Sequence, residues 1–115
     1  MKMQELTNEI IKFRDDRDWK QFHDPKNLAE AISIEAAELQ EIFLWKTVDE
    51  SKKIAGEKRE RIGEELADIF NFGMLLAHEA GIDIEKAILR KIEHNNRKYP
   101  MEKAKGSAKK YTELK

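Results

Sequence analysis

Cysteine is absent from the 115 residues of this chain, and there are only 5 glycines and 2 prolines. Without cysteine the protein has no disulfide, no thiolate metal site and no cysteine nucleophile. The scarcity of glycine and proline leaves long stretches free to form helices. The combination of 39% charged and 40% hydrophobic residues is typical of soluble, mostly helical proteins.

Long apolar runs and leader-like segments are also lacking. The most apolar run, residues 69–77, is about half the length that a helix needs to cross a bilayer. Residues 1–9 are polar and charged, unlike the start of a signal peptide. We therefore expect a cytoplasmic protein that does not interact with membranes.

The formal net charge of -1 conceals an uneven distribution of charge along the chain. Residues 1–85 carry 20 acidic and 12 basic side chains, whereas residues 86–115 carry 3 acidic and 10 basic ones. An acidic body with a basic end could bind a cation and a polyanion together, although a solvated basic tail explains the same pattern. Because no predicted helix carries a basic stripe, we do not expect nucleic-acid binding.

Helical periodicity predicts an all-α fold, a four- to five-helix up-and-down bundle. The expected helices cover residues 3–16, 28–46, 57–80 and 84–98, with a short helical turn within 47–56. Asn27 is the predicted N-cap of the second helix, Gly81 is the predicted stop of the third, and Pro100 blocks the fourth. Phe70 and Met74 give the third helix apolar residues on a second side, which favours association of subunits through helix faces.

Two acidic pairs are the most informative feature of the predicted helices. Glu35 and Glu38 lie on the second helix, Glu65 and Asp68 lie on the third, and each pair shares one helix face. Glu35 and Glu65 fall within apolar stripes, where an unpaired carboxylate is costly. The pattern predicts that the two helices hold Mg²⁺ or Mn²⁺ between them, because hard cations prefer oxygen ligands. Ordinary surface acids in a Glu-rich protein are the alternative.

Other metal sites do not fit the sequence. A di-iron carboxylate bundle requires Glu-x-x-His motifs, and none of the three histidines has a glutamate three residues before it. Zinc is disfavoured by the lack of cysteine and of clustered histidines.

Aromatic and basic residues suggest how a nucleotide could bind. The rings of Trp19 and Trp45 could stack on a nucleobase. His23 and Asn27 could contact base edges, or serve as a loop hydrogen bond and a helix cap. Lys91, Asn95 and Lys98 share nearly one face of the fourth helix and could hold phosphate, although cations in a last turn also stabilise the helix dipole.

These features occur together in an order that resembles a known family. The matching stretches, between about residues 13 and 114, are Arg17-Asp18-Trp19, Gln21-Phe22-His23, Asn27-Leu28, Glu35-Ala36-Ala37-Glu38-Leu39, Phe43-Leu44-Trp45-Lys46, Glu64-Glu65-Leu66-Ala67-Asp68, Lys91 with Asn95, Arg97-Lys98-Tyr99-Pro100 and Lys109-Lys110-Tyr111-Thr112-Glu113-Leu114. In this order and at these distances they resemble the MazG-like all-α nucleoside triphosphate pyrophosphohydrolases. Within that group the resemblance is strongest to the dCTP pyrophosphatases.

The resemblance implies an enzyme that hydrolyses a nucleoside triphosphate, dCTP or a modified dCTP, to the monophosphate and pyrophosphate. It places Glu35, Glu38, Glu65 and Asp68 as Mg²⁺ ligands and catalytic residues, and leaves open which carboxylate accepts the proton of water. It also implies two further sets of contacts. Those to the triphosphate are Lys91, Asn95, Lys98, Lys110 and Tyr111. Those to base and sugar are Trp19, His23, Asn27 and Trp45.

The same resemblance implies a helical domain over residues 1–100, a basic segment over residues 101–115 that contributes to the phosphate site, and a homodimer or homotetramer. Residues 47–57 are shorter than in the eukaryotic relatives, and Ile10 is apolar where some relatives have a polar residue near the base. Both departures affect base preference. A pyrophosphohydrolase of broad specificity and a non-catalytic helical interaction module remain the alternatives.

Overall fold

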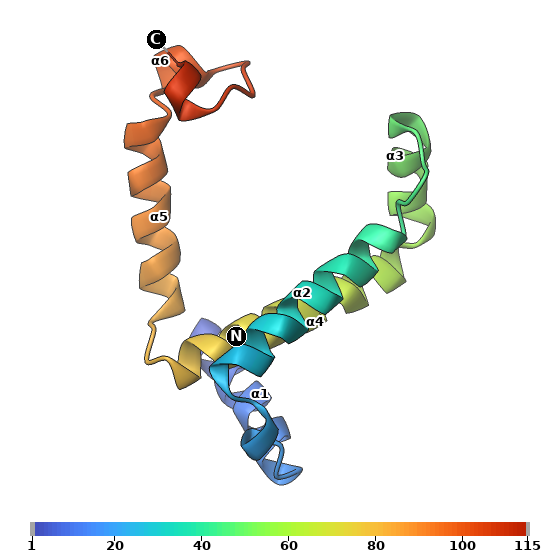
Figure 1. The fold of residues 1–115 in the computed structure, drawn as a ribbon, viewed down its shortest axis with the longest axis vertical. Coiled ribbons are helices and arrows are strands. Elements are labelled where there is room, and N and C mark those ends of the chain that lie inside the picture. Colours follow the sequence, from blue (N-terminus) through green and yellow to red (C-terminus); the bar gives the residue numbers. More distant parts are fainter. Residues whose placement is uncertain (1, 115) are drawn as a thin grey trace. The chain divides into compact units, whose positions relative to one another are not determined.

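The computed structural model describes residues 2–114, and they form helices and connecting loops without any strand. This confirms the all-α prediction. The helices (Figure 1) are α1 (Met3–Asp16), α2 (Pro25–Glu41), α3 (Val48–Glu57), α4 (Arg59–Glu79), α5 (Ile84–Lys98) and α6 (Met101–Ala104). Two 3-10 turns cover Lys20–Phe22 and Tyr111–Glu113. The chain divides into two compact units between Ile82 and Asp83.

The first unit is organised around α2 and α4, which lie side by side and run in opposite directions (Figure 1). Helix α1 packs against α4, and α3 contacts α4. The buried apolar side chains of the described residues all belong to this unit, and they are Leu28, Ile42, Met74, Leu75 and Ala77. All but Ile42 belong to α2 or α4, so this helix pair is the framework on which the unit is built.

Helices α1 and α5 have the bounds that the sequence predicts, whereas α2 begins earlier and ends earlier. Its N-cap is Asp24, whose side chain accepts a hydrogen bond of 2.8 Å from the backbone N–H of Asn27, and Pro25 occupies the first turn. The prediction that Asn27 caps this helix is therefore wrong. At the other end α2 stops at Glu41, and Trp45 adopts a positive φ of 62° within the loop that follows.

The segment between α2 and α4 contains more helix than the predicted turn. Helix α3 spans 10 residues and begins with a capping box. The Thr47 hydroxyl accepts from the Glu50 backbone N–H at 3.1 Å, and the Glu50 carboxylate accepts from the Thr47 N–H at 3.1 Å. Two backbone donors at the helix start are thus satisfied locally.

Gly81 follows α4 as predicted and has a positive φ of 68°, a conformation that suits glycine. Its N–H donates to the carbonyl of His78 at 3.2 Å, and the N–H of Ile82 donates to Ala77 at 2.8 Å. These two bonds form a Schellman motif that ends α4 just before the boundary between the two units.

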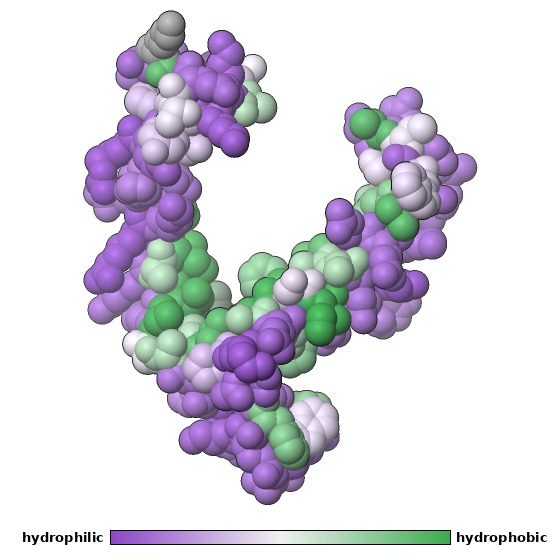
Figure 2. Space-filling view, in the orientation of Figure 1, coloured by the Kyte–Doolittle hydropathy of each residue, from purple (hydrophilic) through white to green (hydrophobic). Residues whose placement is uncertain are grey.

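Apolar side chains remain on the surface of each unit (Figure 2). In the first unit they include Ile34 of α2 and Leu66 and Phe70 of α4, and in the second unit Ile88, Leu89 and Ile92 of α5. Within residues 2–114, no helix combines the length and the hydropathy that a membrane crossing requires.

Candidate functional site

The acidic pairs lie where α2 and α4 pack against each other. One carboxylate oxygen from each of Glu35, Glu38 and Glu65 lies within 4.8 Å of the other two, and all three residues are half-buried. The i, i+3 spacing sets Glu35 and Glu38 on one face of α2. The packing of α2 on α4 then brings Glu65 opposite them.

Two oxygens of this cluster are buried without a hydrogen-bond partner among the described residues. They are Oε2 of Glu35 and Oε2 of Glu65. Burial of a carboxylate oxygen without a hydrogen-bond partner costs free energy. Two such oxygens in one cluster usually indicate a ligand that compensates for their burial. Oxygen-only donors at this spacing fit a hard divalent cation such as Mg²⁺ or Mn²⁺.

The pKa of Glu35 is raised from its ordinary value of 4.5 to about 7. Burial is the largest cause, followed by the adjacent carboxyl group of Glu65 and by the negative charges of Glu38 and Asp68. A cation bound at the cluster would oppose these effects, because opposite charge favours the ionised carboxylate. Proton binding and cation binding therefore compete at Glu35.

Asp68 connects the acidic cluster to a neighbouring cavity of about 300 Å³. Its side chain is exposed, it lines this cavity, and its charge reaches Glu35. Ile10 and Leu75 contribute apolar wall, while Arg14 and Asn71 contribute polar groups. The volume is near the lower end of the range for small-molecule sites, about 300–1,000 Å³.

Four rings follow one another along this cavity. Phe13 and Trp19 are 5.7 Å apart, Trp19 and His23 are 6.4 Å apart, and His23 and Phe72 are 6.2 Å apart, all in edge-to-face arrangements. His23 Nδ1 is buried and has no hydrogen-bond partner among the described residues. The cavity therefore offers flat aromatic surfaces together with an unused polar atom, which suits a planar heterocyclic ligand.

The structure brings Trp19 and His23 together on this cavity but places Asn27 and Trp45 outside its walls. The Asn27 side-chain amide donates to the carbonyl of Phe22 and to the Asp24 carboxylate, each at 3.1 Å, so it stabilises the start of α2. Trp45 is 91% exposed in the loop after α2. The predicted roles of these two residues at the base and sugar stay predictions.

The predicted phosphate contacts belong to the second unit. Lys91, Asn95 and Lys98 lie on α5, and Lys110 and Tyr111 lie at the C-terminal 3-10 turn. The Lys98 ammonium lies 4.1 Å from the centroid of the Tyr111 ring, which also meets Tyr99 edge-on at 6.3 Å. The cation–π contact ties the C-terminal segment to α5 and holds Lys98 beside Tyr111.

Sequence reasoning missed Arg14, Asn71 and Phe72, which also line the cavity. The sequence does contain a signal for Arg14, because this residue follows Ile10 by four positions and therefore shares the apolar face of α1. A charged residue on that face is unusual and, like Glu35 and Glu65, indicates a partner or ligand for the charge. Asn71 and Phe72 gave no such signal, since their role depends on α1 packing against α4.

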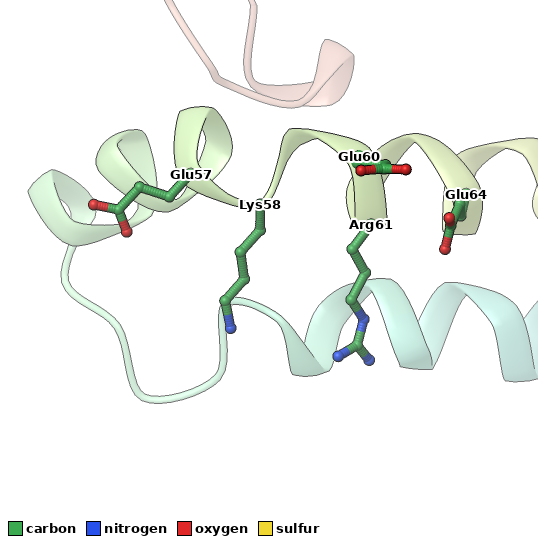
Figure 3. Close-up of a pocket in the computed structure, with 5 residues that line it drawn as sticks. All are labelled: Glu57, Lys58, Glu60, Arg61 and Glu64. Atoms are coloured by element: carbon green, nitrogen blue, oxygen red, sulfur yellow. The ribbon is translucent and has the colours of Figure 1, made fainter.

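A second hollow, at the start of α4, is open and charged (Figure 3). Lys58 and Arg61 extend toward α2, and Glu57, Glu60 and Glu64 accompany them. All five side chains are exposed. Solvated charges of both signs need no ligand to balance them, so we assign no ligand to this hollow.

The fold and the cluster together define an all-α protein with a candidate divalent-cation site between two helices. The family model described as the MazG-like family matches residues 31–114, and the chain belongs to that family. The predicted resemblance is thereby confirmed.

Individual relatives support the same family assignment. The chain is 43% identical over 104 residues to dCTP pyrophosphatase 1 of Bos taurus, covering 89% of this chain and 62% of the relative. It is 42% identical to dCTP pyrophosphatase 1 of Homo sapiens, covering 61% of that protein. The chain thus spans about three-fifths of the length of these curated relatives.

A solved structure supports the fold at similar sequence identity. A crystal structure of a pyrophosphatase from Archaeoglobus fulgidus is similar to this chain, with a TM-score of 0.82 and 43% sequence identity. The similarity covers 85% of this chain and 92% of that one.

Proposed function

We propose that this protein is a divalent-metal-dependent pyrophosphohydrolase that converts a nucleoside triphosphate, dCTP or a modified dCTP, into the monophosphate and pyrophosphate. Such a reaction removes unwanted nucleotides from the precursor pool. The observation that carries the proposal is the cluster of Glu35, Glu38 and Glu65 with its two sealed carboxylate oxygens. The names of the relatives supply the substrate class.

In this proposal Glu35, Glu38, Glu65 and Asp68 hold Mg²⁺ or Mn²⁺ and are the catalytic residues. The cation, when bound, neutralises phosphate charge and activates water for attack on the α-phosphorus. A carboxylate of the cluster accepts the proton of that water. Glu38 and Glu35 are the two candidates for this base.

The base and sugar are assigned to the aromatic cavity of the first unit, with Trp19 and His23 on its walls and Asn27 and Trp45 as further proposed contacts. The triphosphate is assigned to Lys91, Asn95, Lys98, Lys110 and Tyr111. Lysine ammonium groups and the tyrosine hydroxyl donate charge-assisted hydrogen bonds to phosphate oxygens. They would offset the negative charge that develops on departing pyrophosphate. Residues 1–100 would then form the catalytic helical domain, and residues 101–115 would complete the phosphate site.

Broad specificity is the second candidate, and one observation favours it. Ile10 lines the cavity and offers no hydrogen bond to a base edge. If no other wall group reads the base, several nucleotides would fit equally well.

A pyrophosphate-release screen across dNTPs, NTPs and modified nucleotides, with and without Mg²⁺, tests both candidates. We expect Mg²⁺-dependent release that is fastest with dCTP or a modified dCTP. Comparable rates with all nucleotides would establish the broad-specificity alternative. No release from any nucleotide, together with no Mg²⁺-dependent shift in melting temperature, would identify a non-catalytic helical module.

A further inference from the structure

Arg14 is a buried cation whose hydrogen-bonding capacity is only partly used. Its exposed fraction is 2%. Nε donates to Asp15 Oδ1 at 2.9 Å, and Nη1 donates to Glu79 Oε1 at 2.6 Å. A guanidinium group carries five N–H donors, so these two bonds leave three without a partner among the described residues. Unused donors on a buried charge are costly unless a ligand or water accepts from them.

The unused donors belong to a wall of the aromatic cavity. Arg14 lines it from α1, and Asn71 lines it from α4. The side-chain amide of Asn71 is half-buried and makes no hydrogen bond to the described residues. The sealed and unpartnered side-chain atoms within residues 2–114 belong to His23, Glu35 and Glu65. Arg14 Nη2 and the Asn71 amide are not among them, so these groups are not sealed from solvent, and both residues line the cavity.

We infer that Arg14 determines the nucleobase preference of this protein by donating hydrogen bonds to N3 and O2 of a cytosine ring, while the Asn71 carbonyl oxygen accepts from the N4 amino group. The inference deepens the proposed function and rests on it. It assigns a specificity-determining role to two residues outside the acidic cluster. Ion pairing with Glu79 and Asp15 holds the guanidinium plane in place, so the donors are oriented before the base arrives.

The chemistry of the base edge explains why this arrangement would select cytosine. Cytosine presents two adjacent acceptors, N3 and O2, that match the fork of a guanidinium group. Uracil and thymine carry a hydrogen on N3, which would face the guanidinium donors and repel them. A site that places buried donors against a base edge rejects the analogue that cannot accept from them, because those donors stay unpaired.

The experiment compares two variants that disturb the same ion pair in different ways. Arg14→Lys keeps a positive charge beside Glu79 but removes the fork of donors. Glu79→Gln keeps the fork and leaves an acceptor for Nη1. Both are expected to lower the melting temperature. Only Arg14→Lys is expected to lower the ratio of kcat/KM for dCTP over dUTP, by about tenfold or more.

A second measurement uses the unaltered protein and does not depend on turnover. Isothermal titration calorimetry compares the binding of dCMP, dUMP and 3-deaza-dCMP, in which a C–H group replaces N3. We expect the parent protein to bind dCMP about tenfold or more tightly than either analogue. We expect Arg14→Lys to bind dCMP and 3-deaza-dCMP with similar affinity.

The results that would overturn the inference are distinct from those that would overturn the proposed function. If the parent releases pyrophosphate but Arg14→Lys keeps the parent ratio of dCTP to dUTP, then Arg14 is only a structural partner of Glu79. If Arg14→Lys does not fold, the calorimetry decides. Equal affinity of the parent for dCMP and 3-deaza-dCMP would then show that Arg14 is only a structural partner of Glu79. If the parent releases no pyrophosphate at all, the proposed function fails, and the binding preference for dCMP decides the role of Arg14 by itself.

Discussion

The burial of an acidic side chain in this protein, and therefore its chemistry, depends on the helix face on which it lies. Glu64 and Glu65 are neighbours in α4, yet Glu64 is exposed whereas Glu65 is half-buried and has a sealed oxygen. Successive helix positions differ by about 100° in direction, so adjacent residues meet different surroundings. This contrast supplies a matched pair of variants for testing the acidic cluster.

We predict that Glu65→Gln lowers the rate of pyrophosphate release by at least about two orders of magnitude, whereas Glu64→Gln leaves it nearly unchanged. The amide of glutamine cannot supply the negative charge that the proposed cation site needs. Steady-state assays with dCTP and Mg²⁺ measure the effect, and circular dichroism checks that both variants retain their helices. Parent-like turnover by Glu65→Gln would remove this residue from the proposed site.

The raised pKa of Glu35 gives a second prediction, on stability against pH. Its pKa of about 7 in the folded protein exceeds the ordinary value of 4.5, so the folded state binds more protons between these values. The contribution of Glu35 to stability is therefore fully present below about pH 4.5 and is lost as pH rises through about 7. We expect Glu35→Gln to raise the melting temperature of the metal-free protein at pH 8 and to change it little at pH 4.5.

Thermal unfolding in EDTA across this pH range measures that effect. Added Mg²⁺ should stabilise the parent at pH 8 more than it stabilises Glu35→Gln, because the variant lacks one proposed ligand. Identical pH dependence of the two proteins would show that Glu35 is not the group responsible.

At the scale of helices, the sequence predicted those ends that carry strong local signals. Asp83 and Pro100 bracket α5, and Gly81 follows α4, where only a residue tolerant of positive φ fits easily. The start of α2 was misplaced because Asp24 and Asn27 are both good caps. Pro25, which suits the first turn of a helix, identifies Asp24 as the cap that is used.

The remaining errors reflect information that a single helix does not contain. Helix α2 ends at Glu41 although residues 42–46 lack glycine and proline, so propensity alone gave no stop signal. Periodicity found the acids of the cluster because each pair lies on one helix face. It could not find Asn71, whose place on the cavity wall depends on how α1 packs against α4.

We predict that Thr47→Ala lowers the free energy of unfolding by about 0.5–2 kcal/mol, because it removes the hydroxyl that caps α3. Thr47→Ser retains that oxygen and should lose much less. Urea unfolding followed by circular dichroism measures both variants. Equal losses for serine and alanine would mean that the methyl group of Thr47, rather than its hydrogen bond to Glu50, provides the stabilisation.

At the scale of the whole molecule, the chain leaves more large apolar side chains exposed than it buries. The described residues bury five apolar side chains, whereas Ile34 of α2 is 59% exposed and Phe70 of α4 is 61% exposed. Exposed apolar surface on a small protein often marks an interface with another chain. We propose that a second copy covers it, in a homodimer or homotetramer.

This proposal predicts that the parent protein has at least twice the 13.5 kDa mass of one chain, and that Phe70→Glu shifts it toward the monomer. Burial of an unpaired carboxylate in an apolar interface is costly, so the variant should dissociate at concentrations at which the parent stays assembled. At concentrations at which the parent is assembled and the variant is monomeric, the melting temperature of the variant should depend less on protein concentration, by mass action. Phe70→Leu, which keeps the position apolar, is the control. Sedimentation velocity over a range of concentrations measures the masses, and a parent protein that stays monomeric throughout would contradict the proposal.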